Sequence, residues 1–237
     1  MIRRVFLMAA GLIAPLLAAT LAQPLAAQEA PPPGPASPPP AAAVDVVMET
    51  AMGRITIALE TERAPVTAGY ILRHVDEKRL DGAAFYRAMK VVPDGSIGLV
   101  QGGIQDGRKL LPPVAHEPTT TTGLTHDEGA ISLARGAPGS AQAQFFIILG
   151  SLKSLDADPS AAGDNQGFAV FGRVKEGMDV VRRILAVPVS PTRGEGAMKG
   201  QMIEAPVAIT SVRRVIPLPP PRLAPKPAAK KPAARRR

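Results

Sequence analysis

The three histidines are the residues of this sequence best suited to metal binding, but their spacing argues against a metal site. His74 falls in an expected amphipathic helix, whereas His116 and His126 lie ten positions apart in one loop, beside Glu117 and Asp127. A zinc site needs closer ligand pairs on a rigid element, so surface or hydrogen-bonded histidines are the favoured interpretation. No serine-nucleophile, zinc-protease or phosphate-loop motif is present, no hydrolytic triad stands out, and the absence of cysteine excludes disulfides and thiolate chemistry.

Three segments stand out because of their order and spacing. The first is Phe85-Tyr86-Arg87, the second spans 98–103 (Gly-Leu-Val-Gln-Gly-Gly), and the third runs from 132–135 (Ser-Leu-Ala-Arg) to 144–147 (Gln-Phe-Phe-Ile). In these segments the sequence resembles the cyclophilins. That family carries, in the same order, a phenylalanine–histidine–arginine step, a glutamine–glycine–glycine step and a stretch from serine–methionine–alanine to glutamine–phenylalanine–phenylalanine–isoleucine. Residues 171–174 and 177–181 resemble the family's last strand and second helix, so the resemblance covers nearly all of 44–216.

The resemblance implies an all-β fold, a closed eight-stranded antiparallel barrel with two capping helices. It also implies a peptidyl-prolyl cis/trans isomerase without cofactor or metal, whose groove binds a proline-containing polypeptide in extended form. Resonance opposes rotation of the X–Pro bond with a barrier of about 18–20 kcal/mol. In the twisted amide the nitrogen lone pair becomes a hydrogen-bond acceptor, and a donor fixed against it stabilises the transition state more than the ground state. Arginine suits this role because it stays charged and its fork holds more than one acceptor.

The resemblance assigns catalytic roles to three residues. Arg87 is the expected donor to the proline nitrogen, although a lone arginine in a strand is more often a surface ion-pair residue. Gln101 is expected to hold Arg87 and to bond the substrate backbone. Phe146 is the expected floor of the proline pocket, whereas Phe145, which faces the other way along the same strand, is expected in the barrel core.

A second group of residues is expected to bind substrate around this centre. They comprise pocket walls, backbone groups that pair with the residues before proline, and a glutamine near the groove. The wall residues are Leu99, Leu155 and Phe168, the backbone groups are those of Ala134 and Arg135, and the glutamine is Gln144.

Several positions depart from the family pattern. Tyr86 replaces the motif histidine, Gly98 replaces an aromatic residue, and Ser154 falls where a tryptophan is expected. Phe168 replaces a histidine, Arg135 an asparagine, and 156–166 form an insertion rich in Asp, Ala and Gly. The loss of two aromatic residues predicts a more open pocket, weaker cyclosporin binding and slower or differently selective catalysis.

The elements expected to position these residues are mostly short strands. Runs at 44–50 and 54–60 around a glycine-bearing turn predict an antiparallel hairpin, with Ile55, Ile57 and Leu59 on one face. Further strands are expected at 83–92, 97–101, 129–135, 144–149, 168–175 and 207–215. Helical spacing of apolar residues predicts one helix from Pro65 to Leu80 and another from Met178 to Leu185. Many short strands with two helices are typical of a closed antiparallel barrel.

Composition divides the 237 residues into four parts. Residues 1–27 combine Arg3 and Arg4 with an apolar run and small residues, which is typical of a secretory signal peptide and predicts export to the periplasm. An uncleaved anchor ranks second, since the apolar run is shorter than the ~20 residues of a span, and the arginine pair leaves twin-arginine export open. A Pro/Ala-rich linker at 28–43, the isomerase-like domain at 44–216 and a disordered basic tail at 217–237 follow.

The net charge of +8 belongs to the ends of the chain. Residues 44–216 contain 19 basic and 19 acidic side chains, whereas the tail at 217–237 contains seven basic and no acidic ones. A neutral domain argues against a nucleic-acid-binding face. The tail is interpreted as a solubilising arm, with contact to an anionic envelope surface as the sharper alternative.

Three functions therefore compete on the sequence alone. The favoured one is a monomeric prolyl isomerase that assists the folding of exported proteins. The second is a non-catalytic proline-peptide-binding chaperone on the same fold, because a fold does not by itself imply activity. The third is an envelope-binding module that functions through the basic tail.

Overall fold

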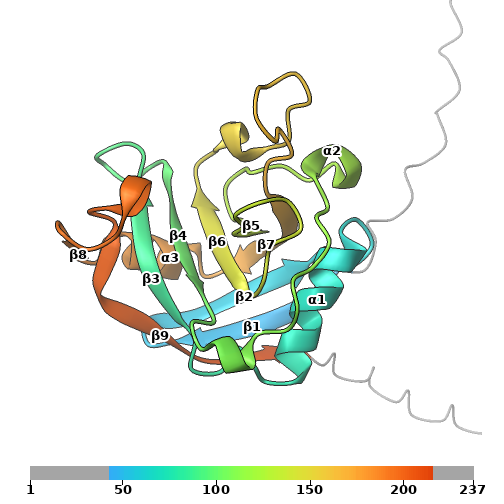
Figure 1. Ribbon diagram of the computed structural model, residues 1–237. Coiled ribbons are helices and arrows are strands. Elements are labelled where there is room, and N and C mark those ends of the chain that lie inside the picture. Colours follow the sequence, from blue (N-terminus) through green and yellow to red (C-terminus); the bar gives the residue numbers. More distant parts are fainter. Residues whose placement is uncertain (1–42, 216–237) are drawn as a thin grey trace, which may run out of the picture. The chain divides into compact units, whose positions relative to one another are not determined.

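The computed structural model describes residues 43–215, and these form a β-barrel with helices packed against it (Figure 1). The predicted signal peptide at 1–27, nearly all of the linker at 28–43 and the tail at 217–237 lie outside the described residues. Within residues 43–215, no helix is long and apolar enough to cross a membrane.

Short strands dominate the described chain, as the sequence predicts. The barrel strands are β1 (Val44–Thr50), β2 (Gly53–Leu59), β3 (Ala84–Lys90), β4 (Gly98–Gly103), β5 (Ala130–Leu133), β6 (Gln144–Leu149), β7 (Ala169–Glu176) and β9 (Met202–Arg214), and the two-residue β8 is Val189–Ser190. Their order is β1-β2-β7-β5-β6-β4-β3-β9, and β9 pairs back onto β1, so that these eight strands close a barrel. Every pairing is antiparallel, and β8 pairs with β9 alone. The predicted closed eight-stranded barrel is confirmed.

The helices are α1 (Pro65–Asp76), α2 (Thr119–Thr122) and α3 (Met178–Leu185). α1 packs against β7 and β9, and α3 packs against β2, β3 and β4. The prediction that the first helix continues to Leu80 is wrong. The chain turns after Asp76, where Lys78 adopts a left-handed φ of 53°, and the turn returns Leu80 to the core at 2% exposure. Burial rather than helical continuity explains the apolar residue at that position.

The last strand begins five residues earlier than predicted, at Met202 instead of 207. Arg87 of β3 pairs with Met202, and Phe85 pairs with Val207, so that four residues of β9 lie opposite Tyr86 alone. This irregular stretch includes Pro206, which has no N–H for the ladder and hides the strand from sequence reasoning.

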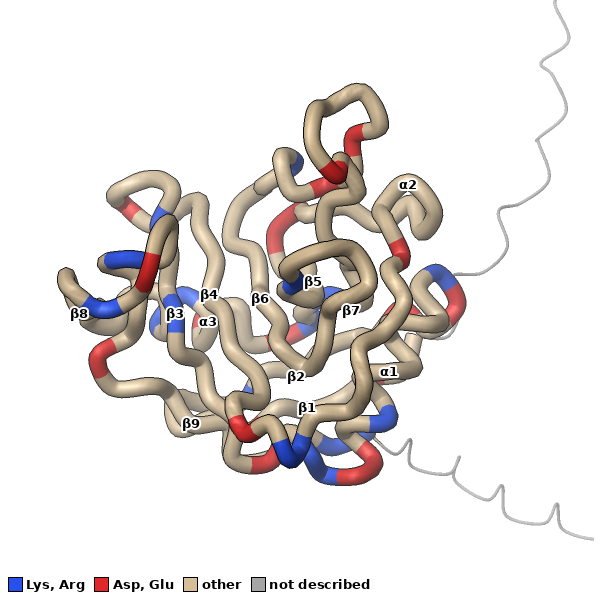
Figure 2. Tube along the Cα trace, in the orientation of Figure 1, with Lys and Arg blue, Asp and Glu red and all other residues tan. Residues whose placement is uncertain are grey.

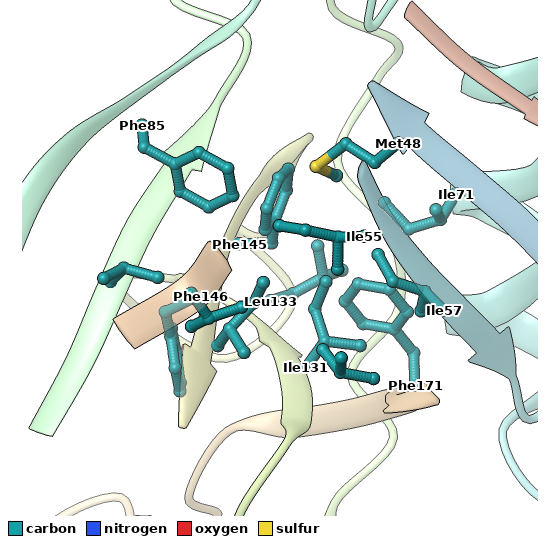
Figure 3. Packing of buried hydrophobic residues seen from close by; sticks show 14 of the residues in the cluster. Met48, Ile55, Ile57, Ile71, Phe85, Ile131, Leu133, Phe145, Phe146 and Phe171 are labelled. Atoms are coloured by element: carbon teal, nitrogen blue, oxygen red, sulfur yellow. The ribbon is translucent and has the colours of Figure 1, made fainter. Parts of the chain in front are cut away.

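Alternation along the strands fills the barrel with apolar side chains (Figure 3). Ile55, Ile57 and Leu59 of β2 are each at most 1% exposed, as predicted for one shared face. Phe145 is also buried, and its ring packs edge-on against Phe85 at a centroid distance of 5.8 Å. Outside the core, basic and acidic residues are interspersed along the described chain (Figure 2), in keeping with the neutral charge of the domain.

Candidate active site

A cavity of about 820 Å³ opens along β3, β4 and β6, and all nine predicted site residues line it. They come from six separate stretches of the chain: Arg87; Leu99 and Gln101; Ala134 and Arg135; Gln144 and Phe146; Leu155; and Phe168. Residues 194–202, which the sequence did not single out, also line it through Gly194, Glu195, Met198 and Met202.

A β-bulge at Tyr86 explains why two consecutive residues face the same cavity. Between β3 and β4, Phe85 pairs with Gly102 and Arg87 pairs with the adjacent Gln101, which leaves Tyr86 as an extra residue. Successive side chains of a regular strand point to opposite faces, but a bulge redirects them. Phe85 therefore enters the core while both Tyr86 and Arg87 line the cavity.

The Arg87 guanidinium is held by three side chains. Its Nη1 donates to Gln101 Oε1 at 2.8 Å, its Nε donates to Gln201 Oε1 at 2.8 Å, and its Nη2 lies 3.5 Å from Met89 Sδ. Arginine carries five N–H donors, so two remain for a ligand in the cavity. Burial lowers the pKa of Arg87 from its ordinary value, and the electrostatic interaction with Tyr86 raises that pKa to a smaller extent.

Tyr86 links two glutamines behind this arginine. Gln101 Nε2 donates to the Tyr86 hydroxyl at 3.0 Å, and that hydroxyl donates to Gln144 Oε1 at 3.1 Å. Burial raises the pKa of Tyr86, with the Gln101 hydrogen bond lowering it, so the phenol remains protonated and able to donate. The tyrosine that departs from the family pattern thus orients both glutamines, Gln101 toward Arg87 and Gln144 toward the groove.

Phe146 lies at the apolar side of the cavity together with Leu99, Leu155 and Phe168. It is 4% exposed, and its ring meets that of Phe168 edge-on, at a centroid distance of 5.4 Å and an interplanar angle of 85°. An apolar enclosure of this kind suits a proline ring, which has no side-chain hydrogen-bonding group. The charged donor and the apolar surface thus lie in one cavity.

The side chain of Arg135 binds the insertion at 156–166. Its Nη1 and Nη2 pair with the two carboxylate oxygens of Asp164 at 2.7 and 2.8 Å, and its Nε donates to Gly167 O at 2.7 Å. The guanidinium also lies over the Phe168 ring, 5.3 Å from its centroid. Arg135 lowers the pKa of Asp164 to about 2. Arg135 therefore fixes both the insertion and the Phe168 wall of the pocket.

One of the two backbone hydrogen-bonding groups of Ala134 is already bonded within the protein. Its N–H donates to Gln144 O at 2.8 Å, so a peptide can bond Ala134 only through the carbonyl group. The expected pairing with the residues before proline is limited to that one group at this position.

Two departures from the family pattern have structural reasons. A Cβ at Gly98 would lie 2.4 Å from Met89 O, so the close approach of β3 and β4 leaves no room for an aromatic side chain there. Ser154 is exposed and lies outside the cavity lining. Neither Gly98 nor Ser154 lines the cavity, whereas Phe168 does and packs against Phe146.

A buried polar chain that the sequence did not reveal supports the pocket from behind. His126 Nδ1 donates to Asp156 Oδ1 at 2.6 Å, and its Nε2 lies 3.1 Å from the Ser132 hydroxyl. The His126 ring stacks on the Phe146 ring, with a centroid distance of 5.9 Å and an interplanar angle of 18°. Ser132 and His126 are both 0% exposed, so the serine cannot reach a substrate as a nucleophile. These hydrogen bonds instead keep the His126 ring stacked on Phe146 and connect Asp156, at the start of the insertion, with Ser132 of β5.

Stability is expected to fall as the pH drops below about 6.5, the ordinary pKa of histidine. Burial lowers the pKa of both His74 and His126 in the folded protein, with hydrogen bonds to Tyr70 O and Asp156 opposing it. The unfolded chain therefore binds more protons as the pH falls through that value, and the free energy of unfolding decreases until the folded-state pKa values are reached.

Urea unfolding between about pH 7.5 and 5 measures this slope, in a range above the titration of the salt-bridged carboxylates. His126→Gln should make the slope shallower. A wild-type stability that is flat over this range, or an equal slope in the variant, would contradict the expectation.

Comparison with known proteins identifies the family and supports the barrel fold. The family model described as cyclophilin type peptidyl-prolyl cis-trans isomerase/CLD matches residues 45–213. A peptidyl-prolyl cis-trans isomerase of Acinetobacter baylyi is 35% identical over 172 residues, which cover 71% of this chain and 84% of that protein. A peptidyl-prolyl cis-trans isomerase of Streptomyces antibioticus is 34% identical over 173 residues, which cover 71% of this chain and 96% of that protein.

Solved structures support the fold. The crystal structure of a Cryptosporidium parvum cyclophilin type peptidyl-prolyl cis-trans isomerase has a TM-score of 0.56 and 16% identity, and covers 74% of this chain and 99% of that one. A second structure of that protein, determined in the presence of the dipeptide Ala-Pro, has a TM-score of 0.56 and 18% identity.

Proposed function

The chain belongs to the cyclophilin-type peptidyl-prolyl cis-trans isomerases, and we propose that it accelerates X–Pro rotation in proteins that fold after export to the periplasm. The observation that carries the catalytic part is the position of Arg87. Its guanidinium is fixed by Gln101 and Gln201 at a cavity whose apolar side is formed by Phe146.

The proposed reaction needs no covalent intermediate. The substrate proline packs on Phe146, which holds the ring while the preceding carbonyl rotates. As the amide twists, its nitrogen pyramidalises, and a free Arg87 N–H donates to the lone pair that has left conjugation. This bond forms only in the twisted state, so it lowers the barrier without tightening ground-state binding. Gln101 holds Arg87 and donates to the Tyr86 hydroxyl, so neither partner must reorganise during rotation.

The exported location is supported by the sequence of residues 1–27, with its paired arginines, apolar run and small residues. To test it, the full chain is expressed in a Gram-negative bacterium, the cells are fractionated and the N-terminal residue of the mature protein is determined. A periplasmic protein that begins after Ala27 is expected. An intact N-terminus in the cytoplasmic fraction would overturn the proposal for export but leave the enzymatic part unaffected.

The role in folding has a separate test. Catalytic amounts of the protein are added to a refolding protein whose slow phase is a prolyl isomerisation, which takes tens of seconds or longer without a catalyst. The slow phase should accelerate in proportion to enzyme concentration. An unchanged slow phase, with short proline peptides still isomerised, would restrict the activity to peptides and contradict a role in protein folding.

A further inference from the structure

Gln201 lies just before β9 and outside the cavity lining, yet it contacts the centre of the site. Its Oε1 accepts a 2.8 Å hydrogen bond from Arg87 Nε, and its Nε2 donates to Ala197 O at 2.8 Å. The arginine only donates and the carbonyl only accepts, so one orientation of the amide satisfies both partners. The amide of Gln201 is therefore fixed with its oxygen toward Arg87.

The backbone of Gln201 is tied to the strand that carries Arg87. Gln201 O accepts a 2.9 Å hydrogen bond from Ala88 N, the residue after Arg87. Gln201 N donates to Met198 O at 3.1 Å, and the next residue, Met202, pairs with Arg87 in the sheet. Side chain and backbone of Gln201 thus follow any displacement of β3 at this point.

Hydrogen bonds close the turn that precedes Gln201. Gly194 adopts a φ of +95°, and a Cβ there would lie 2.3 Å from Met198 O. Gly200 N donates to Arg193 O at 3.0 Å, and Arg193 Nη2 donates to the carbonyl of Ile203 at 2.6 Å. The segment at 193–201 is thus a hydrogen-bonded turn, and Ala197 O and Ala88 N of β3 each bond Gln201.

The two amide oxygens that Arg87 contacts act on different nitrogens, beside the longer contact of Nη2 with Met89 Sδ. Gln101 holds Nη1, whereas Gln201 holds Nε, the nitrogen through which the guanidinium joins the rest of its side chain. With Gln101 alone, the guanidinium could pivot about that one hydrogen bond. Two bonds at separate nitrogens define the plane of the group and hence the direction of the remaining N–H donors. A small misplacement of a catalytic group can lower a rate substantially.

We infer that Gln201 is a positioning residue for the isomerase reaction, which aims the free N–H groups of Arg87 by holding its Nε. This inference rests on the proposed catalytic role of Arg87. Because Gln201 lies outside the cavity lining, it acts through Arg87 and not on the substrate. Loss of its acceptor should therefore lower kcat and leave KM nearly unchanged.

Two variants and a control test the inference in the full-length protein. Gln201→Met keeps an unbranched side chain but removes the acceptor, whereas Gln201→Glu keeps an acceptor for Arg87 Nε. Gln166→Met makes the same chemical change at an exposed glutamine of the insertion. We expect Gln201→Met to lower kcat about 10-fold, Gln201→Glu to retain most of the wild-type kcat, and Gln166→Met to match the wild type.

The orientation of Arg87 is measured separately by NMR. The Arg87 Nε–H, identified by its disappearance in Arg87→Ala, should exchange slowly with water in the wild type and in Gln201→Glu, and faster in Gln201→Met. Fast exchange in the wild type, unchanged kcat in Gln201→Met, or equal effects of Met and Glu would each overturn the inference. Full activity of Arg87→Ala would instead overturn the proposed role of Arg87, and the positioning role with it. If Gln201→Met does not fold, the Nε–H exchange rate in the wild type and the kcat of Gln201→Glu still test the positioning role.

Discussion

Replacement of Arg87 by alanine is expected to lower kcat/KM for a proline peptide by about 100- to 1000-fold, the usual effect of removing one transition-state donor. The loss should fall on kcat, because the donor bonds the proline nitrogen only when the amide is twisted. Arg87 is partly buried, and its partners Gln101 and Gln201 lose a hydrogen bond each in the variant. Thermal unfolding must therefore be measured beside the kinetics.

Arg108→Ala provides a matched control for this change. Arg108 is an arginine whose side chain is 91% exposed and pairs with Asp106, so its removal should leave kcat/KM unchanged. Arg87→Lys keeps the charge but loses the planar fork that Gln101 and Gln201 hold, and should recover little of the lost rate. Wild-type kinetics in a folded Arg87→Ala variant would contradict the assignment.

Replacement of Phe146 by alanine is expected to weaken both binding and stability. The side chain is 4% exposed and contacts the rings of Phe168 and His126, so its loss should lower the free energy of unfolding by about 3–5 kcal/mol. It also removes the surface on which the substrate proline packs. Since burying such an apolar group contributes about 1.5–3 kcal/mol, KM should rise at least about 10-fold. Urea unfolding and peptide kinetics measure the two effects.

Phe171→Ala separates the two consequences of the Phe146 change. Phe171 is 1% exposed in the barrel core and does not line the cavity, so its loss should cost comparable stability without raising KM of the folded protein. Equal increases of KM in both variants would show that the Phe146 effect comes from general loosening of the barrel. The pocket floor would then have to be sought elsewhere.

The closed barrel and the roles of the predicted site residues were expected from the resemblance to the cyclophilins, whereas the individual strands follow from local patterns. Alternation of apolar residues marks β2, and the arginine, glutamine and phenylalanine of the three segments come together because neighbouring strands β3, β4 and β6 carry them. A motif and the strand that presents it are encoded in the same few residues. The start of α1 at Pro65 follows from the same local reasoning.

What the sequence did not predict depends on contacts between distant segments. Gln201 reaches Arg87 across 114 positions, from a turn with no motif of its own. Asp156 reaches His126 across 30 positions, and the pair occupies a buried site that loop composition did not suggest. The early start of β9 is hidden by Pro206, and the end of α1 by the burial of Leu80 after a turn. In each case tertiary packing, not local propensity, decides the position.

The most direct test of catalysis is exchange NMR on a short proline peptide with a small amount of the full-length protein. A small amount of a catalyst accelerates both directions of rotation and leaves the cis-to-trans ratio unchanged, because it lowers the barrier between the two isomers without changing the free energy of either free isomer. We predict that the exchange rate between the cis and trans signals rises with protein concentration while their ratio stays constant. A rate that stays at its uncatalysed value, with peptide signals that shift on binding, would contradict catalysis and identify a proline-peptide binder.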